Sequence, residues 1–397
     1  MRTDLGWRLD PGVTYLNHGS FGACPEPVLA VQREVRDRLE RQPVAFLDRE
    51  LPPLLDDARE RVGAFLGADP DGLAFVANAT TGVNAVLRSL RFAPGDELLT
   101  NDHEYNAILT TLQEVGRRDG ARVVIAQVPF PTLGDDEVVA AMLGAATPRT
   151  RLAVISHITS PTALILPIER LVRELDARGI DTLVDGAHAP GMVPLALDAL
   201  GAAYYTGNGH KWLCGPKGAA FLWVRADRRE AIRPTVISHG ANDPRTDRSR
   251  FRLEFDWTGT ADPSAALALP AAIDWMAAQC PGGWPAIMAA NHALAVTGRN
   301  LLATTLGVLA PAPDAMLGSM AALPIPGLET DAAAVALHDS LIDEDRIEVP
   351  FPTWPVRGAR LQPGDPPTAV LVRVSAQRYN DRGDLERLAA SLRARLG

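Results

Sequence analysis

Short runs of consecutive apolar residues alternate with amphipathic runs between about residues 73 and 224. The apolar runs predict seven strands, at 73–76, 96–100, 122–126, 152–156, 182–184, 203–206 and 219–224. The amphipathic runs predict helices, among them 81–90, 107–117 and 168–178. Apolar strands joined by helices are typical of a parallel sheet covered on both faces. Because the last two strands follow each other without a helix, we expect an α/β domain with a mostly parallel, mixed seven-stranded sheet.

The pattern changes after residue 227. Two long helices are predicted at 263–279 and 284–306, and a strand at 369–375 precedes a closing helix at 384–396. We therefore expect a large domain at residues 31–235 and a smaller α+β domain at 236–397. Residues 1–30 are rich in turn-forming residues, and we expect them to pack on the domains.

Composition narrows the class of protein. The 397 residues carry a formal net charge of −9 and no basic run, which argues against binding to nucleic acid or to an anionic membrane surface. Three widely spaced cysteines exclude a disulfide framework and a thiolate zinc site. The stretch after Met1 lacks the apolar region of an export signal, and no apolar run is long enough to span a bilayer. We expect a soluble cytoplasmic protein.

Lysine is scarce in this chain. Of 39 basic residues only Lys211 and Lys217 are lysines. Arginine replaces lysine as a surface charge but not as a neutral amine nucleophile. Lys211 follows the strand at 203–206 in a glycine-rich turn, at the sheet edge where α/β proteins bind ligands. We predict that Lys211 forms a Schiff base and that Lys217 has a supporting role.

Asp185 ends another apolar strand and reaches the same edge. A carboxylate beside a Schiff-base lysine indicates pyridoxal phosphate, whose ring nitrogen must stay protonated to act as an electron sink. The alternative is a metal site built from Asp185 and His188, with His103 and Glu104.

The segment from Asn78 to Thr81 lies between the first strand and its helix. Free N–H groups at a helix start favour a phosphate, although the same residues also suit an ordinary helix cap. With Lys211 and Asp185 nearby, we favour phosphate binding.

Three stretches together resemble the class V aminotransferase family of fold-type-I pyridoxal-phosphate enzymes. They are Asn78-Ala79-Thr80-Thr81, Asp185-Gly186-Ala187-His188 and the run from His210 to Gly218. Within that family the chain is most similar to isopenicillin N epimerase-like proteins, through the NHGSFG motif at 17–22, DHEYNA at 102–107 and SHITSPT at 156–162. The resemblance extends over nearly the whole chain.

The resemblance implies a role for each matching residue. Lys211 would form the Schiff base and move the Cα proton, Asp185 would pair with the pyridinium nitrogen, and His188 would lie near the phenolic oxygen. Tyr105 would stack on the cofactor ring. The residues that would hold the phosphate are Thr80, Thr81, Asn208, His210 and, from the neighbouring subunit of an obligate homodimer, Thr260.

The substrate would be an α-amino acid, a small molecule whose side chain the sequence does not identify. The resemblance implies that Arg373 grips its carboxylate, whereas the other interpretation of Arg373 is a salt bridge on an edge strand. Ser160 stands where cysteine desulfurases carry an asparagine beside the cofactor, and Asn17 is a candidate for the substrate mouth.

We expect an enzyme that acts at Cα of an α-amino acid through the Lys211 Schiff base and a quinonoid, as an epimerase. The alternatives are a C–S β-lyase on bulky S-substituted cysteines, which releases pyruvate and ammonia, and an aminotransferase or oxidative deaminase. Desulfurases need a mobile cysteine in the C-terminal third, and this chain has none beyond Cys280. A metal-dependent hydrolase and a non-catalytic binding module are the rivals from other classes.

Overall fold

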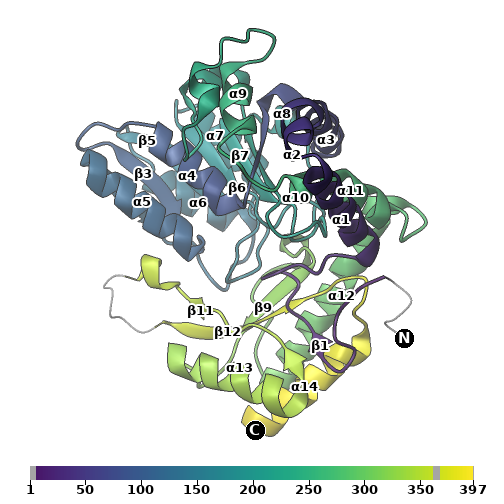
Figure 1. Ribbon diagram of the computed structural model, residues 1–397. Helices are drawn as coiled ribbons and strands as arrows, with labels where there is room; N and C mark the ends of the chain where they lie inside the picture. The colour runs from purple at the N-terminus through teal and green to yellow at the C-terminus, as the bar shows by residue number, and fades with distance from the viewer. Residues whose placement is uncertain (1–5, 361–366, 397) are drawn as a thin grey trace.

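A seven-stranded sheet forms the larger part of the molecule (Figure 1). The computed structural model describes residues 6–360 and 367–396. The strands lie in the order β2-β8-β7-β6-β5-β3-β4. Their bounds are β2 (Leu73–Val76), β3 (Glu97–Asn101), β4 (Arg122–Ala126), β5 (Thr150–Ser156), β6 (Asp181–Asp185), β7 (Tyr204–Asn208) and β8 (Ala220–Val224). The predicted α/β class with a seven-stranded sheet is therefore confirmed.

The directions of the strands determine which strand ends lie at the same edge of the sheet. β4, β3, β5, β6 and β7 are mutually parallel, whereas β8 is antiparallel to both β7 and β2. The carboxyl ends of β2, β3, β5, β6 and β7 therefore lie at one edge, together with the beginning of β8. Candidate residues that follow these strands are brought to that edge by the topology alone.

The sheet is buried on both faces, as its near-continuous apolar strands predict. Successive residues of β5 belong to different clusters: Leu152 and Val154 pack on one face, and Ala153 and Ile155 on the other. Helices cover both faces (Figure 1). Those that connect or follow the strands are α4 (Ala79–Ser89), α5 (Asn106–Asp119), α6 (Asp135–Ala145), α7 (Ile168–Asp176), α8 (Leu197–Leu200) and α9 (Arg250–Asp256).

A three-stranded antiparallel sheet, β11-β12-β9, forms the C-terminal part at the bottom of Figure 1. It consists of β9 (Met320–Pro324), β11 (Thr353–Trp354) and the central β12 (Ala369–Ser375). Its helices are α12 (Gly283–Leu306), α13 (Asp331–Asp345) and α14 (Arg382–Leu396). The central place of β12 buries its side chains, including that of Arg373, which is 4% exposed.

The N-terminal segment joins this C-terminal part. β1 (Thr14–Tyr15) pairs in parallel with β10 (Ile347–Glu348), and the amide of Ser375 donates to the carbonyl of Leu16. The chain then turns through α1 (Glu26–Arg41), α2 (Pro43–Ala45) and α3 (Leu51–Leu66), which lie beside the large sheet (Figure 1). Short 3₁₀ or π turns complete the chain at η2 (Phe46–Glu50), η3 (Pro70–Gly72), η4 (Ala226–Ala231), η5 (His239–Asn242), η6 (Asp314–Met316) and η7 (Arg357–Ala359).

The predicted long helix at 263–279 is in fact two, α10 (Ser264–Leu267) and α11 (Leu269–Ala277). Pro270 has no N–H to donate to the carbonyl of Ala266, so the helical hydrogen bonding is interrupted there. Both helices pack on α1 and α3, although they follow residue 235. The division of the chain into domains at residues 30 and 235 stays a prediction. None of the helices in 6–360 and 367–396 has both the length and the apolar character to cross a membrane.

Candidate active site

A cavity of about 440 Å³ opens at the carboxyl edge of the large sheet. Its floor is formed by Ser156 at the end of β5 and Asp185 at the end of β6, which are directly opposite each other in the parallel pair. The other predicted residues that line it are Thr80, Tyr105, Ser160, His188, Asn208, His210 and Lys211. The structure therefore brings most of the predicted site residues together, as expected from the strand directions.

Lys211 lies in the turn after β7. Its Nζ is 3.0 Å from Nε2 of His188, in the loop after β6. Burial, reinforced by the positive charge of Arg373, lowers the pKa of Lys211 to about 7, against the opposing effect of Asp185. The side chain is thus protonated below about pH 7 and a neutral amine above it. A neutral amine is the form that acts as nucleophile or base.

Two carboxyl groups are buried beneath the cavity. Asp185 is 4% exposed, and burial raises its pKa, although the amide of Ala187 and the charge of Lys211 favour its ionised form. Glu104 is completely buried, and burial together with Asp185 raises its pKa to about 8. Glu104 Oε1 accepts hydrogen bonds from Ser156 Oγ at 2.6 Å and from the amide of Tyr105 at 2.7 Å. Glu104 is therefore protonated at neutral pH, and Asp185 is the carboxyl group that faces Lys211 across the cavity.

From the sequence, Glu104 was a candidate only for a metal ligand, and its position beside Asp185 was not predicted. The available signal was its position three residues after the end of β3, at the edge where Asp185 and Ser156 end the neighbouring parallel strands. His103 beside it hydrogen-bonds to Thr162 Oγ1 and to the carbonyl of Val128. Within the part of the chain that the structure describes, no group of three His, Cys, Asp or Glu residues is arranged to hold a metal ion.

Arg373 reaches the same region from β12. One Nη donates to the carbonyl of Ser160 at 2.6 Å and the other to Oγ of Ser20 at 2.7 Å. Nε of Arg373 is buried without a partner, and the guanidinium forms no ion pair with any carboxylate of the described residues. Burial lowers the pKa of Arg373 to about 10. The salt bridge that was the other interpretation of Arg373 is absent from the described residues.

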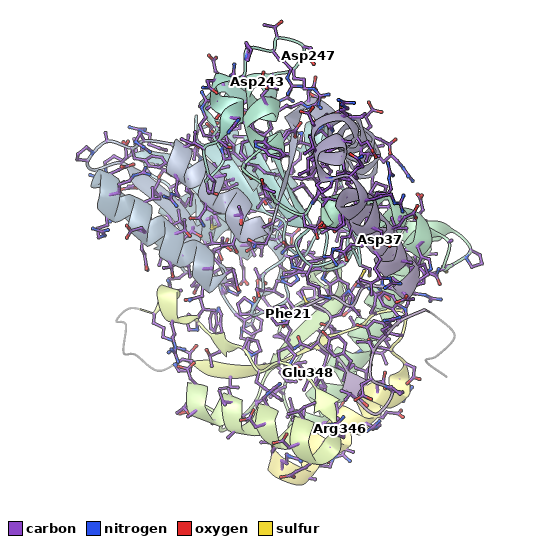
Figure 2. All side chains as sticks on the ribbon, in the orientation of Figure 1. Phe21, Asp37, Asp243, Asp247, Arg346 and Glu348 are labelled. Atoms are coloured by element: carbon purple, nitrogen blue, oxygen red, sulfur yellow. The ribbon has the colours of Figure 1, made fainter. Side chains whose placement is uncertain are left out.

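The NHGSFG segment at 17–22 connects the two parts of the site. Ser20 binds Arg373, and a Cβ on Gly22 would lie 2.6 Å from the carbonyl oxygen of Lys211, so only glycine fits there. Lys217 donates to the carbonyl of Gly22, which is its supporting contact. Phe21 lines the cavity while 70% exposed, and Figure 2 shows it between the large sheet and the C-terminal part.

Three predicted residues lie elsewhere. Asn17 donates to Glu348 and lines a separate hollow beside α13. The Thr81 hydroxyl bonds to Asn78, and Thr81 lines a neighbouring hollow. Thr260 lines a third hollow, together with Val44 and Leu51. Their predicted roles toward cofactor and substrate stay predictions. Among the described residues, Thr260 is not one of those that line the cavity of Lys211.

Comparisons with known proteins agree with this geometry. A family model for aminotransferase class-V proteins matches residues 44–388. The chain is 40% identical to the isopenicillin N epimerase of Amycolatopsis lactamdurans, over 97% of this chain and 96% of the relative. It is 37% identical to that of Streptomyces clavuligerus, over 98% and 96%. It is also 32% identical to a probable chloroplastic L-cysteine desulfhydrase of Arabidopsis thaliana, over 96% and 82%.

Solved structures share the fold. A C-DES mutant with glycine covalently linked to its PLP cofactor has a TM-score of 0.79 at 24% identity, covering 98% of this chain and 97% of that one. The cysteine desulfurase CsdA of Escherichia coli has a TM-score of 0.77 at 22% identity, covering 98% and 96%. At such identities the likeness shows the fold alone, and this fold is the predicted fold type I.

The cavity fits pyridoxal phosphate by the chemistry of its residues. The amide of Ala79 at the start of α4 donates to Asn208 Oδ1, so the helix start and the end of β7 form one wall, and Thr80 stands on it. The buried Nδ1 of His210 has no hydrogen-bond partner among the described residues, so it is available to donate to a phosphate oxygen. Asp185 would pair with the ring nitrogen and Lys211 would bind the aldehyde carbon.

We predict that Lys211 of the cofactor-free protein titrates near pH 7 rather than near its ordinary 10.5. Arg373→Met should raise this pKa and Asp185→Asn should lower it, each by about one unit, because a nearby positive charge disfavours the ammonium and a negative one favours it. The measurement is NMR of ¹³C-methylated lysines, which is simple because the chain has two. Lys217 is the internal reference, and a Lys211 titration near 10.5 would contradict the account.

Proposed function

We propose that this chain, which belongs to the class V aminotransferase family of pyridoxal-phosphate enzymes, is an epimerase that inverts Cα of an α-amino acid. The family and its cofactor, both predicted from the sequence, are confirmed by the family match over residues 44–388. We infer the reaction from the similarity to isopenicillin N epimerase and propose that this chain, too, inverts one carbon of an amino acid.

The observation that carries this proposal is the placement of two acid–base groups on either side of the cavity floor. Lys211 follows β7 and Tyr105 follows β3, and both line the cavity. β6 and β5 lie between β7 and β3, so Asp185 and Ser156 separate the two groups. An epimerase needs one group to remove the Cα proton and a second to return it from the other side, and we assign these two steps to Lys211 and Tyr105.

In the proposed reaction, Arg373, Lys211 and Tyr105 each have a separate role. Arg373 binds the substrate carboxylate, because its guanidinium is buried, fixed by Ser20 and Ser160 and without an anionic partner in the described residues. Nζ of Lys211, neutral above about pH 7, accepts the Cα proton. Bound pyridoxal phosphate supplies an electron sink for the negative charge that develops at Cα. The phenol of Tyr105, which is 46% exposed at the cavity wall, donates a proton from the other side.

A C–S lyase is the second candidate function. It is supported by the similarity to the probable L-cysteine desulfhydrase and by the fact that β-elimination needs only the base on Lys211. A desulfurase reaction lacks its nucleophile: Cys24 and Cys214 are buried, Cys280 packs beside α11, and none of these three cysteines lines the cavity.

The experiment that tests the proposal follows the Cα proton. The loaded enzyme is incubated in D₂O with isopenicillin N, free amino acids and S-substituted cysteines, and products are read by mass spectrometry and chiral separation. We expect deuterium at Cα in both configurations without pyruvate, and no exchange with Lys211→Ala. Tyr105→Phe should keep exchange with retained configuration but slow inversion at least about 100-fold.

Other outcomes decide between the candidates. Release of pyruvate from the cysteine conjugates, without inversion of any substrate, would replace the epimerase by the lyase. Exchange that is equally fast in the wild type and in Lys211→Ala would contradict the role of Lys211.

We also propose that the enzyme is a homodimer. Exposed apolar side chains gather beside two hollows at the sheet edge: Val236 is 57% exposed, Ile237 70% and Val44 78%. Thr260 lies in one of these hollows, outside the cavity that contains Lys211. A second copy docked on this face would cover the apolar residues, and Thr260 of one protomer would then approach the phosphate site of its partner.

We expect Ile237→Asp to convert the dimer to monomers and to lower the affinity for the cofactor about tenfold or more, because a charge would be buried at the interface. Sedimentation velocity and cofactor absorbance measure both effects. Leu309→Asp is the matched control, since Leu309 is 89% exposed and lies three residues after the end of α12. A dimer that is unchanged by Ile237→Asp would place the interface elsewhere.

A further inference from the structure

His188 is held between two side chains. Its Nδ1 is 3.4 Å from the indole Nε1 of Trp212, and its Nε2 is 3.0 Å from Nζ of Lys211. His188 is 2% exposed and Trp212 1%, so the contact between these two side chains is shielded from water. Trp212 directly follows Lys211 in the chain, so one turn supplies both partners of this imidazole.

The donor and acceptor roles follow from the chemistry of these groups. An indole N–H only donates, so Nδ1 of His188 must present a lone pair to Trp212. A neutral imidazole then carries its proton on Nε2. A doubly protonated ring would direct a second N–H at the indole N–H, and burial together with the charges of Lys211 and Arg373 lowers the pKa of His188 well below its ordinary value.

The proton on Nε2 has a consequence for Lys211. Nε2–H can donate to Nζ only when Nζ carries a lone pair, and an ammonium has none. If the proton were on Nδ1 instead, Nε2 would accept from the ammonium of Lys211. The hydrogen bond from Trp212 and an ammonium on Lys211 are therefore alternatives at the same imidazole.

We propose that Trp212 is a positioning residue whose indole N–H fixes His188 in the tautomer with its proton on Nε2, so that the ring presents a donor to Lys211 and to the cavity. The inference concerns groups of this chain alone. It holds whether the enzyme is an epimerase or a lyase, so its failure and that of the proposed function are separate outcomes.

Packing keeps the indole in place. The ring of Trp212 lies against that of His18, with 4.8 Å between the ring centroids. Nε2 of His18 donates to the carbonyl of Lys211 at 3.0 Å, which holds the turn from the side of the N-terminal segment. A Cβ on Gly191, in the loop that carries His188, would lie 2.5 Å from the carbonyl oxygen of Trp212. The two loops thus fit closely at the backbone, and the indole itself is 1% exposed.

The first test reads the tautomer directly. Solid-state NMR of the cofactor-loaded, full-length enzyme with ¹⁵N-labelled histidine distinguishes protonated from unprotonated ring nitrogens. His188→Gln serves only to assign the signals among eight histidines. We expect His188 to have a bare Nδ1 and a protonated Nε2. A proton on Nδ1 in the wild-type enzyme would overturn the proposal.

The second test removes the indole N–H. In cofactor-free Trp212→Phe, ¹³C-methyl NMR should show the pKa of Lys211 raised by about one unit, because His188 is then free to accept from the ammonium. Trp223→Phe is the matched control: Trp223 is buried and its Nε1 has no partner among the described residues. It loses similar packing and should leave that pKa unchanged.

A failure to fold would not end the test. Benzothienylalanine at position 212 keeps the shape of the indole and replaces its N–H by sulfur, and the same rise in pKa is expected. An unchanged Lys211 pKa in a folded variant, or an equal rise in Trp223→Phe, would show that Trp212 acts through packing alone and would overturn the proposal.

Discussion

The structure depends on holding three ionisable groups around one cavity. Lys211 and Asp185 line this cavity, and Arg373 is buried behind Ser20 and Ser160, which also line it. Burial of an unpaired charge costs several kcal/mol, so each group must be neutralised or bound by fixed dipoles. Lys211 becomes a weak base and bonds to an imidazole. Asp185 accepts from the amide of Ala187, and Arg373 donates to Ser20 and to the carbonyl of Ser160. In the function we propose, ligands would supply the missing partners: a cationic ring nitrogen for Asp185 and a carboxylate for Arg373.

The fold makes this arrangement possible by bringing distant segments to one edge. Asp185, Lys211 and Tyr105 lie at or just after the carboxyl ends of parallel strands of the large sheet. Arg373 lies on β12 of the C-terminal sheet. The NHGSFG segment joins the two, since it contacts both the backbone of Lys211 and the guanidinium of Arg373. A displacement of this segment therefore changes the base and the carboxylate site together.

Local patterns were sufficient for most of the fold and for the chemistry that depends on single residues. The strands at 73–76, 122–126 and 369–375 have the observed bounds, because each is a short, mainly apolar run rich in β-branched or aromatic residues or leucine. Lys211 stood out by the scarcity of lysine, and Asp185 by its place at a strand end. Contacts between segments had no such signal. Glu104 beneath Asp185, Trp212 beside His188, and the turn of Asn17 toward Glu348 all depend on tertiary packing.

The central claim is that the buried guanidinium of Arg373, which has no carboxylate partner among residues 6–360 and 367–396, binds a substrate carboxylate beside a neutral Lys211. The most direct measurement compares the dissociation constants of an α-amino acid and of its carboxamide for the loaded enzyme, by titration of the cofactor absorbance. The account predicts that the wild type binds the acid about 100-fold more tightly than the carboxamide, because only the acid forms charge-assisted hydrogen bonds with the guanidinium. Arg373→Met should lose this preference while still binding the cofactor. Equal affinities for acid and carboxamide in the wild type would contradict it.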